Sequence, residues 1–355
     1  MKNGQFFYDT NGQHINAHGG CFLKHEGIWY WYGEHKTEGF DGRFAWKYGV
    51  HVYSSTDLAN WTDHGCALAL VDDDPESPIL RGERVERPKV IYCEKTGKFV
   101  MYFHSANKDH SRADMGVAVS DTPIGPFEFL YAERAEKGVW PMDVTRRDQD
   151  PKRIAVCPTW EDRTPDWRYR IEQSAIVGRD FERGQGVRDQ TLFVDDDGKA
   201  YHFYTSGDNS TIHIAELTDD FLHHTGKYAR MAQGRWQEAP VIFKHNNIYY
   251  MLTSGCTGFL PNAAHGLCAE NIWGPWFEFD NPCRGEDLAT DAGPELTWNC
   301  QGACGFFSGG KQYVVFDRWN MKNFIDSQYV WLPVEFHDNR TFTITWQDEC
   351  VPELD

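Results

Sequence analysis

The chain repeats one pattern five times, and this repeat limits the folds open to it more than any other feature. Each copy has a short apolar stretch, a turn with Gly or Asn, an aromatic-rich stretch and a further apolar stretch. The aromatic-rich stretches are GIWYWYGE (27–34), GKFVMYFH (97–104), GKAYHFYT (198–205), NIYYMLTS (247–254) and GKQYVVFD (310–317). Aromatic and β-branched residues directly after such a turn are typical of β-hairpins. The sequence therefore predicts five similar antiparallel units.

The spacing of these units indicates how they are arranged. Units of three or four antiparallel strands that recur at roughly 50–100 residues fit blades placed radially around an axis. A sandwich of two sheets, the competing all-β arrangement, does not explain a hairpin that recurs with the same third strand. Long amphipathic helices are absent from the sequence, which argues against α/β and helical folds. We expect an all-β fold, a five-bladed β-propeller, with residues 1–355 forming a single domain.

One interval breaks the repeat. Residues at about 135–188, between the second and third blades, form a long charged insertion that contains Trp140, Trp160 and Trp167. Because loops need solvent for their backbone groups, this insertion must leave the core. Two interpretations stay open: a surface excursion, which could be an oligomer contact, and a wall or lid over the functional pocket, since loops of this length are often functional. The sequence leaves the oligomeric state undetermined.

The charge balance excludes several classes of partner. The chain carries 53 acidic and 35 basic side chains, a formal net charge of −18. Such a surface repels phosphate backbones and anionic lipids, so we expect no nucleic acid and no membrane partner. The first residues lack the apolar run of a signal peptide, which predicts a cytoplasmic location, although a trimmed secreted form would read the same. Ten cysteines without CxxC pairs fit reduced, mostly buried side chains.

Each repeat places a polar residue at the same distance before its aromatic stretch. Counting back nine positions from the first residue of that stretch gives His18, Asp189, Glu238 and Gln301 in the first, third, fourth and fifth repeats. In the second repeat, whose turn is two residues longer, counting back eleven positions gives Glu86. In a propeller the innermost strands all begin at one mouth of the central channel. One such residue alone would fit a solvated strand start, but five in register indicate a shared pocket.

Three carboxyl groups around one mouth are the pattern that acid–base chemistry requires. Glycoside hydrolysis uses one neutral carboxyl group as proton donor and one ionised group opposite it. Glu238 lies between Trp236 and an Ala-Pro step, an apolar setting that favours its protonated form, so we interpret it as the general acid. Asp189, in the neighbouring blade, would orient this acid and keep its pKa high. Glu86 and Arg87 are suited to binding sugar hydroxyls.

Four further residues are weaker candidates for contacts with a sugar. Glu34, at the end of the first aromatic stretch, could bind a hydroxyl or pair with Lys36. Arg318 and Trp319 follow the fifth aromatic stretch, and Trp319 could stack on a sugar ring or lie buried between blades. Thr257, in the loop TSGCTGFLPN, could lie beside the pocket together with the two residues after it.

The sequence shows no pattern of metal ligands. The acidic runs at 71–77 and 194–198 lack the EF-hand spacing. The fifteen histidines include no HExxH, and Cys300 and Cys304 have no further paired ligands. We therefore expect no metal and no cofactor.

With these motifs in place, the chain resembles glycoside hydrolase family 43, and within it the exo-β-1,3-galactanase-like branch. The stretches AHGG…YWYGEHK, VERPKVI, RDQTLFVDDDG, EAPVIFKHN and DRW carry the resemblance, which runs from about Asn16 to Phe336 apart from the insertion. The resemblance implies a five-bladed propeller that hydrolyses with inversion and removes arabinose, xylose or galactose units from plant polymers.

The resemblance also implies roles for individual residues. Most members of the family have a general-base Asp in the first blade, a modulating Asp in the third and an acid Glu in the fourth; Asp189 and Glu238 match the last two. The first blade reads INAHGG, without a carboxylate. In the galactanase-like branch a Gln of the fifth blade takes the base-like role, here Gln301, and Glu86 matches a substrate-binding Glu. Because an amide has little basicity, the base stays open among Gln301, His18 and Glu86.

The function expected from the sequence is therefore exo-acting release of β-linked galactose from galactan or arabinogalactan-derived oligosaccharides. Two alternatives remain. One is α-L-arabinofuranosidase or β-xylosidase activity, as elsewhere in the family. The other is a non-catalytic carbohydrate-binding propeller that has lost its base.

Overall fold

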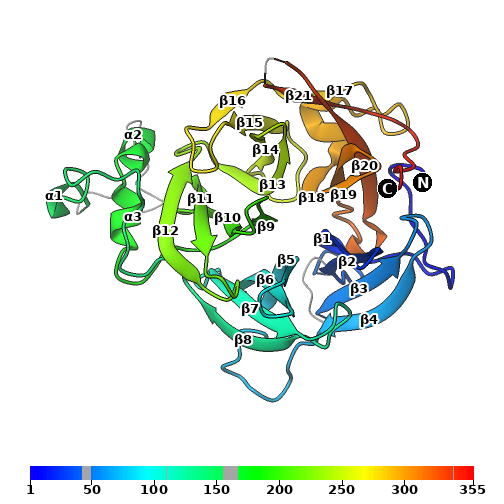
Figure 1. Ribbon diagram of the computed structural model, residues 1–355, viewed down its shortest axis with the longest axis horizontal. Helices are drawn as coiled ribbons and strands as arrows, with labels where there is room; N and C mark the ends of the chain where they lie inside the picture. Colours follow the sequence, from blue (N-terminus) through cyan, green and yellow to red (C-terminus); the bar gives the residue numbers. More distant parts are fainter. Residues whose placement is uncertain (42–48, 109, 155–166, 339) are drawn as a thin grey trace.

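The chain folds as the predicted five-bladed β-propeller (Figure 1). The computed structural model describes residues 1–41, 49–108, 110–154, 167–338 and 340–355. Each blade is one antiparallel sheet, and consecutive strands of the sheet run from the centre outward. The repeated hairpins of the sequence are the first two strands of each blade.

The strand bounds follow the repeat. Blade 1 comprises β1 (His18–His25), β2 (Ile28–Glu34), β3 (Val50–Ser55) and β4 (Thr62–Leu68). Blade 2 comprises β5 (Arg84–Cys93), β6 (Lys98–Ala106), β7 (Asp114–Ser120) and β8 (Glu128–Glu133). Blade 3 comprises β9 (Gln190–Val194), β10 (Ala200–Ser206), β11 (Thr211–Leu217) and β12 (His224–Met231).

The last two blades complete the ring. Blade 4 comprises β13 (Gln237–His245), β14 (Ile248–Gly255), β15 (His265–Ala269) and β16 (Phe277–Phe279). Blade 5 comprises β18 (Gln301–Ser308), β19 (Lys311–Arg318), β20 (Gln328–Phe336) and β21 (Phe342–Thr345), with β17 (Cys283–Arg284) added in parallel to β21. Two 3₁₀ helices, η3 (Pro294–Asn299) and η4 (Phe324–Asp326), flank blade 5.

The inner strands β1, β5, β9, β13 and β18 contact one another in a closed ring around the axis. Aromatic side chains fill the seam between the first and last blades, where Trp31 and Trp331 lie buried with their ring centroids 5.4 Å apart. Such pairs contribute roughly 0.5–1.5 kcal/mol beyond the area that they bury. The termini meet beside this seam, and Met1 and Cys350 exchange backbone hydrogen bonds. Ring closure therefore fixes the five inner strands relative to one another.

The segment between β8 and β9 leaves the ring, as its sequence predicted. It carries three short helices, α1 (Pro151–Ile154), α2 (Trp167–Glu172) and α3 (Ala175–Arg179), which lie outside β12 in Figure 1. Asp143 of this segment pairs with Arg230 of β12 at 2.8 Å. The three helices of this segment thus lie on the outer side of blade 3, and Trp160 lies outside the described residues. None of the helices in the described part of the chain is long and apolar enough to cross a membrane.

Candidate active site

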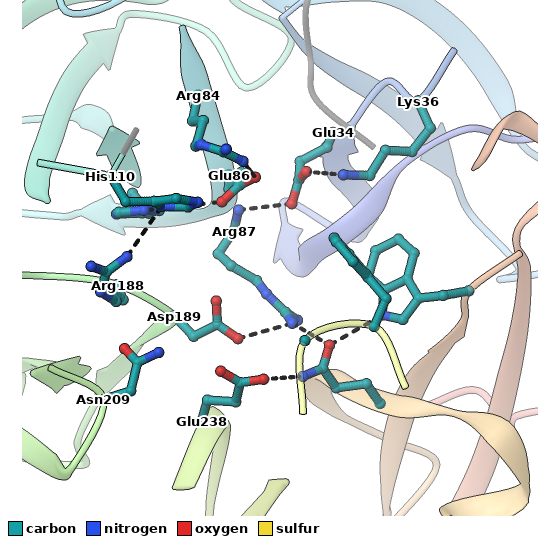
Figure 2. Close-up of a pocket in the computed structure, with 15 residues that line it drawn as sticks. Glu34, Lys36, Arg84, Glu86, Arg87, His110, Arg188, Asp189, Asn209 and Glu238 are labelled. Carbon is teal, nitrogen blue, oxygen red and sulfur yellow. Dashed lines mark hydrogen bonds and ion pairs between the residues drawn. The ribbon is translucent and has the colours of Figure 1, made fainter. Parts of the chain in front are cut away.

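The starts of the inner strands enclose a cavity of about 260 Å³ (Figure 2). Of the five residues that the repeat placed in register, all except His18 line it. The full lining is Glu34, Lys36, Arg84, Glu86, Arg87, His104, His110, Arg188, Asp189, Asn209, Glu238, Gly258, Phe259, Gln301 and Trp319. The cavity is therefore dominated by charged and amide side chains from all five blades.

Equivalent register brings these residues together. In four blades, the first-strand residue lies opposite the last residue of the aromatic stretch; these pairs are His18 with Glu34, Glu86 with His104, Glu238 with Ser254, and Gln301 with Asp317. In blade 3, the carbonyl of Asp189 accepts a hydrogen bond from the backbone N–H of Thr205, which also ends its stretch. Residues at the same position of the repeat therefore occupy the same place in their blades.

A bulge follows that position in several blades. The strand ladder is interrupted directly after the first-strand residues His18, Glu86 and Glu238. The residues that follow them have positive φ: Gly19 (60°), Arg87 (53°) and Ala239 (52°). Bulges re-aim side chains beside active sites, and a left-handed conformation is costly for residues other than glycine. The strained backbone turns the preceding side chain out of the regular alternation of the strand.

Arg87 connects the acidic groups of the site. Its Nη2 lies 2.9 Å from Asp189 Oδ2 and donates to Gln301 Oε1 at 2.6 Å. Its Nη1 donates to the carbonyl of Gly302 at 3.1 Å, and its backbone N–H donates to Glu34 Oε1 at 2.9 Å. Burial opposes the charged guanidinium, but the nearby carboxylates, Asp189 first, raise the pKa of Arg87 above its ordinary value. Arg87 therefore stays cationic and holds Asp189 and Gln301 in place, in addition to the predicted contact with sugar hydroxyls.

The amide of Gln301 has one orientation only. The Arg87 guanidinium and the Trp319 indole N–H can only donate, so the atom that faces them, at 2.6 and 3.1 Å, is the amide oxygen. The amide nitrogen then donates to Glu238 Oε1 at 3.2 Å and to Ser254 Oγ at 3.0 Å. All four contacts are within hydrogen-bond distance, and they join blades 2, 4 and 5 at the base of the cavity.

Glu238 is held in its neutral form. Burial, and after it the negative charge of Asp189, raise the pKa of Glu238 from 4.5 to about 8, although Arg87 and the hydrogen bond from Gln301 oppose the shift. At neutral pH most of the Glu238 carboxyl groups therefore carry a proton. A neutral carboxylic acid that faces a cavity beside an ionised carboxylate is the arrangement of a general acid.

Glu86 lies at the opposite end of the Arg87 side chain from Glu238 (Figure 2). Its carboxylate is 3.6 Å from Arg84 Nη1 and 4.0 Å from His104 Nε2. Burial, followed by the negative charge of Glu34, raises the pKa of Glu86. A raised pKa makes the ionised form of Glu86 a stronger base than an ordinary carboxylate.

Comparisons with known proteins show the family of the chain. The family model for glycosyl hydrolases family 43 matches residues 166–341. A family 43 β-1,3-galactosidase solved with galactodeoxynojirimycin is 43% identical, with a TM-score of 0.90 and 99% of each chain covered. The chain belongs to glycoside hydrolase family 43. It is a glycosidase of the exo-galactanase-like kind.

More distant members of family 43 share the fold over the whole chain. An exo-β-1,3-galactanase from Clostridium thermocellum is 30% identical, with a TM-score of 0.78; the match covers 99% of this chain and 66% of that one. An exo-β-1,3-galactanase from Phanerochaete chrysosporium, solved with β-1,3-galactotriose, is 26% identical with a TM-score of 0.75, and 99% and 68% of the two chains are covered. No curated protein matches the chain.

In this family 43 member, His18 does not reach the cavity. Its side chain is fully buried; Nδ1 lies 2.9 Å from Asp317 Oδ1 and Nε2 lies 3.3 Å from the Tyr329 hydroxyl. The imidazole also stacks on the Tyr329 ring, with centroids 4.6 Å apart. The prediction that His18 binds substrate is wrong, because a carboxylate of the adjoining fifth blade holds the ring inside the seam.

Two further predicted contacts lie outside the cavity. Arg318 forms an ion pair with Asp287 at 2.7 Å and donates to the carbonyl of Trp298 at 3.0 Å. Thr257 is exposed, and its hydroxyl donates to the carbonyl of Leu260 at 2.6 Å. Neither Arg318 nor Thr257 is among the residues that line the cavity, and a contact of either with substrate stays a prediction. The two residues after Thr257 do line the cavity, so the loop was placed correctly.

The structure also decides between the interpretations of Glu34 and Trp319. Glu34 Oε2 forms an ion pair with Lys36, and both side chains are almost fully buried. Glu34 thus supports the wall of the cavity. Trp319 is only partly buried; its ring lines the cavity and meets Phe259 edge to face at 5.5 Å. Trp319 therefore offers the predicted platform beside the amide of Gln301.

Several cavity residues were not predicted from the sequence. Arg188 directly precedes Asp189, and Arg84 lies two positions before Glu86, so their closeness to predicted residues was a usable signal. Asn209 lies in the turn after β10, whose sequence gives no sign that it faces the channel mouth. In Figure 2, Arg84 lies above Glu86, and Arg188 and Asn209 lie to the left of Asp189.

Proposed function

We propose that this protein is an exo-β-1,3-galactosidase that releases galactose from the ends of β-1,3-linked galacto-oligosaccharides. The proposal is supported by the full-length similarity to a β-1,3-galactosidase and by the two exo-β-1,3-galactanases described above. A cavity of about 260 Å³ is below the usual range for pockets that hold drug-sized ligands. It suits one terminal sugar unit and therefore exo-acting cleavage.

The observation that carries the proposal is the arrangement of Glu238 between Asp189 and Gln301. Glu238, with a pKa of about 8, keeps its proton at neutral pH. Asp189 lies beside it and forms an ion pair with Arg87 at 2.9 Å. The site thus holds a neutral carboxyl group and an arginine-paired carboxyl group at neighbouring strand starts, the two carboxyl groups that glycoside hydrolysis requires.

In the proposed reaction Glu238 passes its proton to the glycosidic oxygen as the bond from that oxygen to the anomeric carbon breaks. A water molecule attacks the anomeric carbon from the opposite face, so the product has inverted configuration. Gln301 holds the sugar and this water in position. Its oxygen already accepts hydrogen bonds from Arg87 and Trp319, which limits its own basicity.

The attacking water must also lose a proton. With His18 enclosed by Asp317 and Tyr329, the predicted candidates that line the cavity are Gln301 and Glu86. Glu86 is the carboxylate whose pKa is raised by burial and by Glu34, which strengthens it as a base. We assign proton acceptance to Glu86 and positioning of the water to Gln301.

The test is hydrolysis of β-1,3-galactotriose, with the products separated over time and the anomeric configuration of the first product read by proton NMR. We expect galactose and galactobiose to appear first, with the released galactose in the α-configuration. Nitrophenyl arabinofuranoside and nitrophenyl xyloside serve as alternative substrates. Faster release of arabinose or xylose than of galactose would refute the galactosidase assignment and favour the other activities of the family.

A further inference from the structure

A second hollow opens beside the catalytic cavity. It has a volume of about 290 Å³ and shares His110 and Arg188 with that cavity. Its other charged lining residues include Arg134, Arg183 and Asp208. Three arginines thus face one small hollow in a chain whose formal net charge is −18. Asp180 and Asp208 also line the hollow, so its three arginines and two aspartates leave a net charge of +1, opposite in sign to the charge of the whole chain.

The carboxylates around the hollow already have partners. Asp180 is almost fully buried and is contacted by Arg179 at 2.7 Å, Arg183 at 2.8 Å and Arg134 at 3.5 Å. Asp208 is bound through both oxygens by Arg179, at 2.7 and 3.1 Å. Two carboxylates therefore face several guanidinium groups. Burial, and next the positive charge of Arg183, lower the pKa of Arg134, and the negative charges of Asp180 and Asp114 oppose the shift.

Arg188 contributes much of the excess positive charge around the hollow. Its Nη1 donates to His110 Nδ1 at 3.2 Å, and within the described part of the chain no carboxylate lies in ion-pair distance of its guanidinium. The neighbouring carboxylate, Asp189, is turned toward Arg87 instead. A guanidinium has five donors, so Arg188 keeps donors for a ligand. It stands on the boundary between the catalytic cavity and the hollow.

We infer that this hollow is a binding site for an acidic sugar unit, a uronic acid, carried by the oligosaccharide whose terminal galactose occupies the catalytic cavity. The planar fork of an arginine matches the two oxygens of a carboxylate. Arg188 binds that carboxylate, and Arg183 and Arg134 supply the surrounding positive potential. This inference rests on the proposed function, because the galactose-containing chain is what delivers the acidic unit to the hollow.

Because of the position of Arg188, we expect the hollow to contribute to substrate specificity. Because His110 and Arg188 line both spaces, the hollow adjoins the catalytic cavity, and our inference places a branch of the bound sugar on the hollow side of Arg188. We expect kcat/KM for an acidic branch to exceed that for a neutral branch of the same shape by about tenfold at low salt, and less at high salt.

The experiment compares five substrates: β-1,3-galactotriose, two derivatives that carry glucuronic acid on O6 of the terminal or of the next galactose, and the methyl ester of each acidic derivative. The ester keeps the size of the branch and removes its charge. The measured quantity is the acid-to-ester ratio of kcat/KM. A ratio near ten that falls with added salt supports the inference, and a ratio of one or below for both branch positions overturns it.

Single substitutions test which residues determine the acid-to-ester ratio of kcat/KM. Arg188→Gln is expected to bring the acid-to-ester ratio close to one. Arg183→Gln, at a partly exposed position, is expected to lower the ratio about threefold. Arg168→Gln is the matched control, because Arg168 lies on α2 of the same segment and pairs with Glu172 away from the hollow. A ratio that falls equally in Arg168→Gln and Arg183→Gln contradicts the proposed site.

A binding measurement separates this inference from the proposed function. Calorimetry with methyl glucuronoside and with its methyl ester reports on the hollow without any hydrolysis. If β-1,3-galactotriose is not cleaved while the acid binds and the ester does not, the proposed function fails and the acidic site stands. If the trisaccharide is cleaved but acid and ester bind and react alike, the acidic site is refuted and the galactosidase stands.

Discussion

Glu238 Oε1 accepts a hydrogen bond from Gln301 Nε2 at 3.2 Å, so the acid of blade 4 is joined directly to the amide of blade 5. The carbonyl oxygen is the better acceptor of a neutral carboxyl group, so this hydrogen bond favours the proton on Oε2. Since Arg87 and Trp319 fix the Gln301 amide from its other end, the direction in which Glu238 offers its proton is set before any substrate binds.

Removing this proton should stop hydrolysis without disturbing the fold. In Glu238→Gln we expect kcat on β-1,3-galactotriose to fall by about 10²–10⁴, the usual contribution of a general acid, while the circular dichroism spectrum stays unchanged. Glu94→Gln, at an exposed position in the turn of blade 2, is the control and should retain the wild-type rate. Near-wild-type turnover by Glu238→Gln would remove Glu238 from the mechanism.

Glu238 should also lower the free energy of unfolding at high pH. Its pKa rises from 4.5 to about 8 on folding, so the stability linked to its proton is fully present below pH 4.5 and is lost as the pH rises through 8. Glu238→Gln does not titrate, and relative to wild type it should gain on the order of 4 kcal/mol in free energy of unfolding between pH 5 and pH 9. Urea unfolding at both pH values measures this gain. An equal difference at pH 5 and pH 9 would show that Glu238 titrates normally.

The pH profile of hydrolysis should depend on Asp189. The acid is active while protonated, so wild-type kcat/KM should decline above about pH 8. In Asp189→Asn the negative charge that raises the pKa of Glu238 is gone and Arg87 loses its partner, and both changes favour the ionised acid. The alkaline limb should therefore move to lower pH, in addition to a lower maximum. Asp219→Asn, an exposed change on the opposite side of blade 3, should leave the limb in place.

The register of the repeat was sufficient to predict the propeller and to place Glu86, Asp189, Glu238 and Gln301 around one cavity. Register is a property of backbone spacing, which a single sequence records directly. The same count placed His18 there as well. The spacing does not show that a side chain of a neighbouring blade forms a hydrogen bond with His18.

Contacts across blades explain the other differences. His18 turns into the seam because Asp317, remote in sequence, lies 2.9 Å away once the ring has closed. Arg188 belongs to the site because the turn after β10 and the end of the inserted segment meet beside it, and neither element carries a repeated pattern. Long-range pairs of this kind depend on the closed ring, so local sequence patterns do not reveal them.

Substitutions of Gln301 and His18 should have different effects: the first should reduce activity and the second should reduce stability. Gln301→Ala removes the acceptor of Arg87 and Trp319 and the donor to Glu238, so we expect a loss of at least 10² in kcat with a small change in Tm.

His18→Ala should have the opposite signature. It leaves Asp317 buried without its imidazole partner, so unfolding should become easier by about 3 kcal/mol. The protein that remains folded should still hydrolyse galactotriose, because His18 does not line the cavity. Stopped assays below the Tm of each variant, normalised to the folded fraction, give the comparison. A folded but inactive His18→Ala beside an active Gln301→Ala would assign the water to the histidine and overturn the role of the amide.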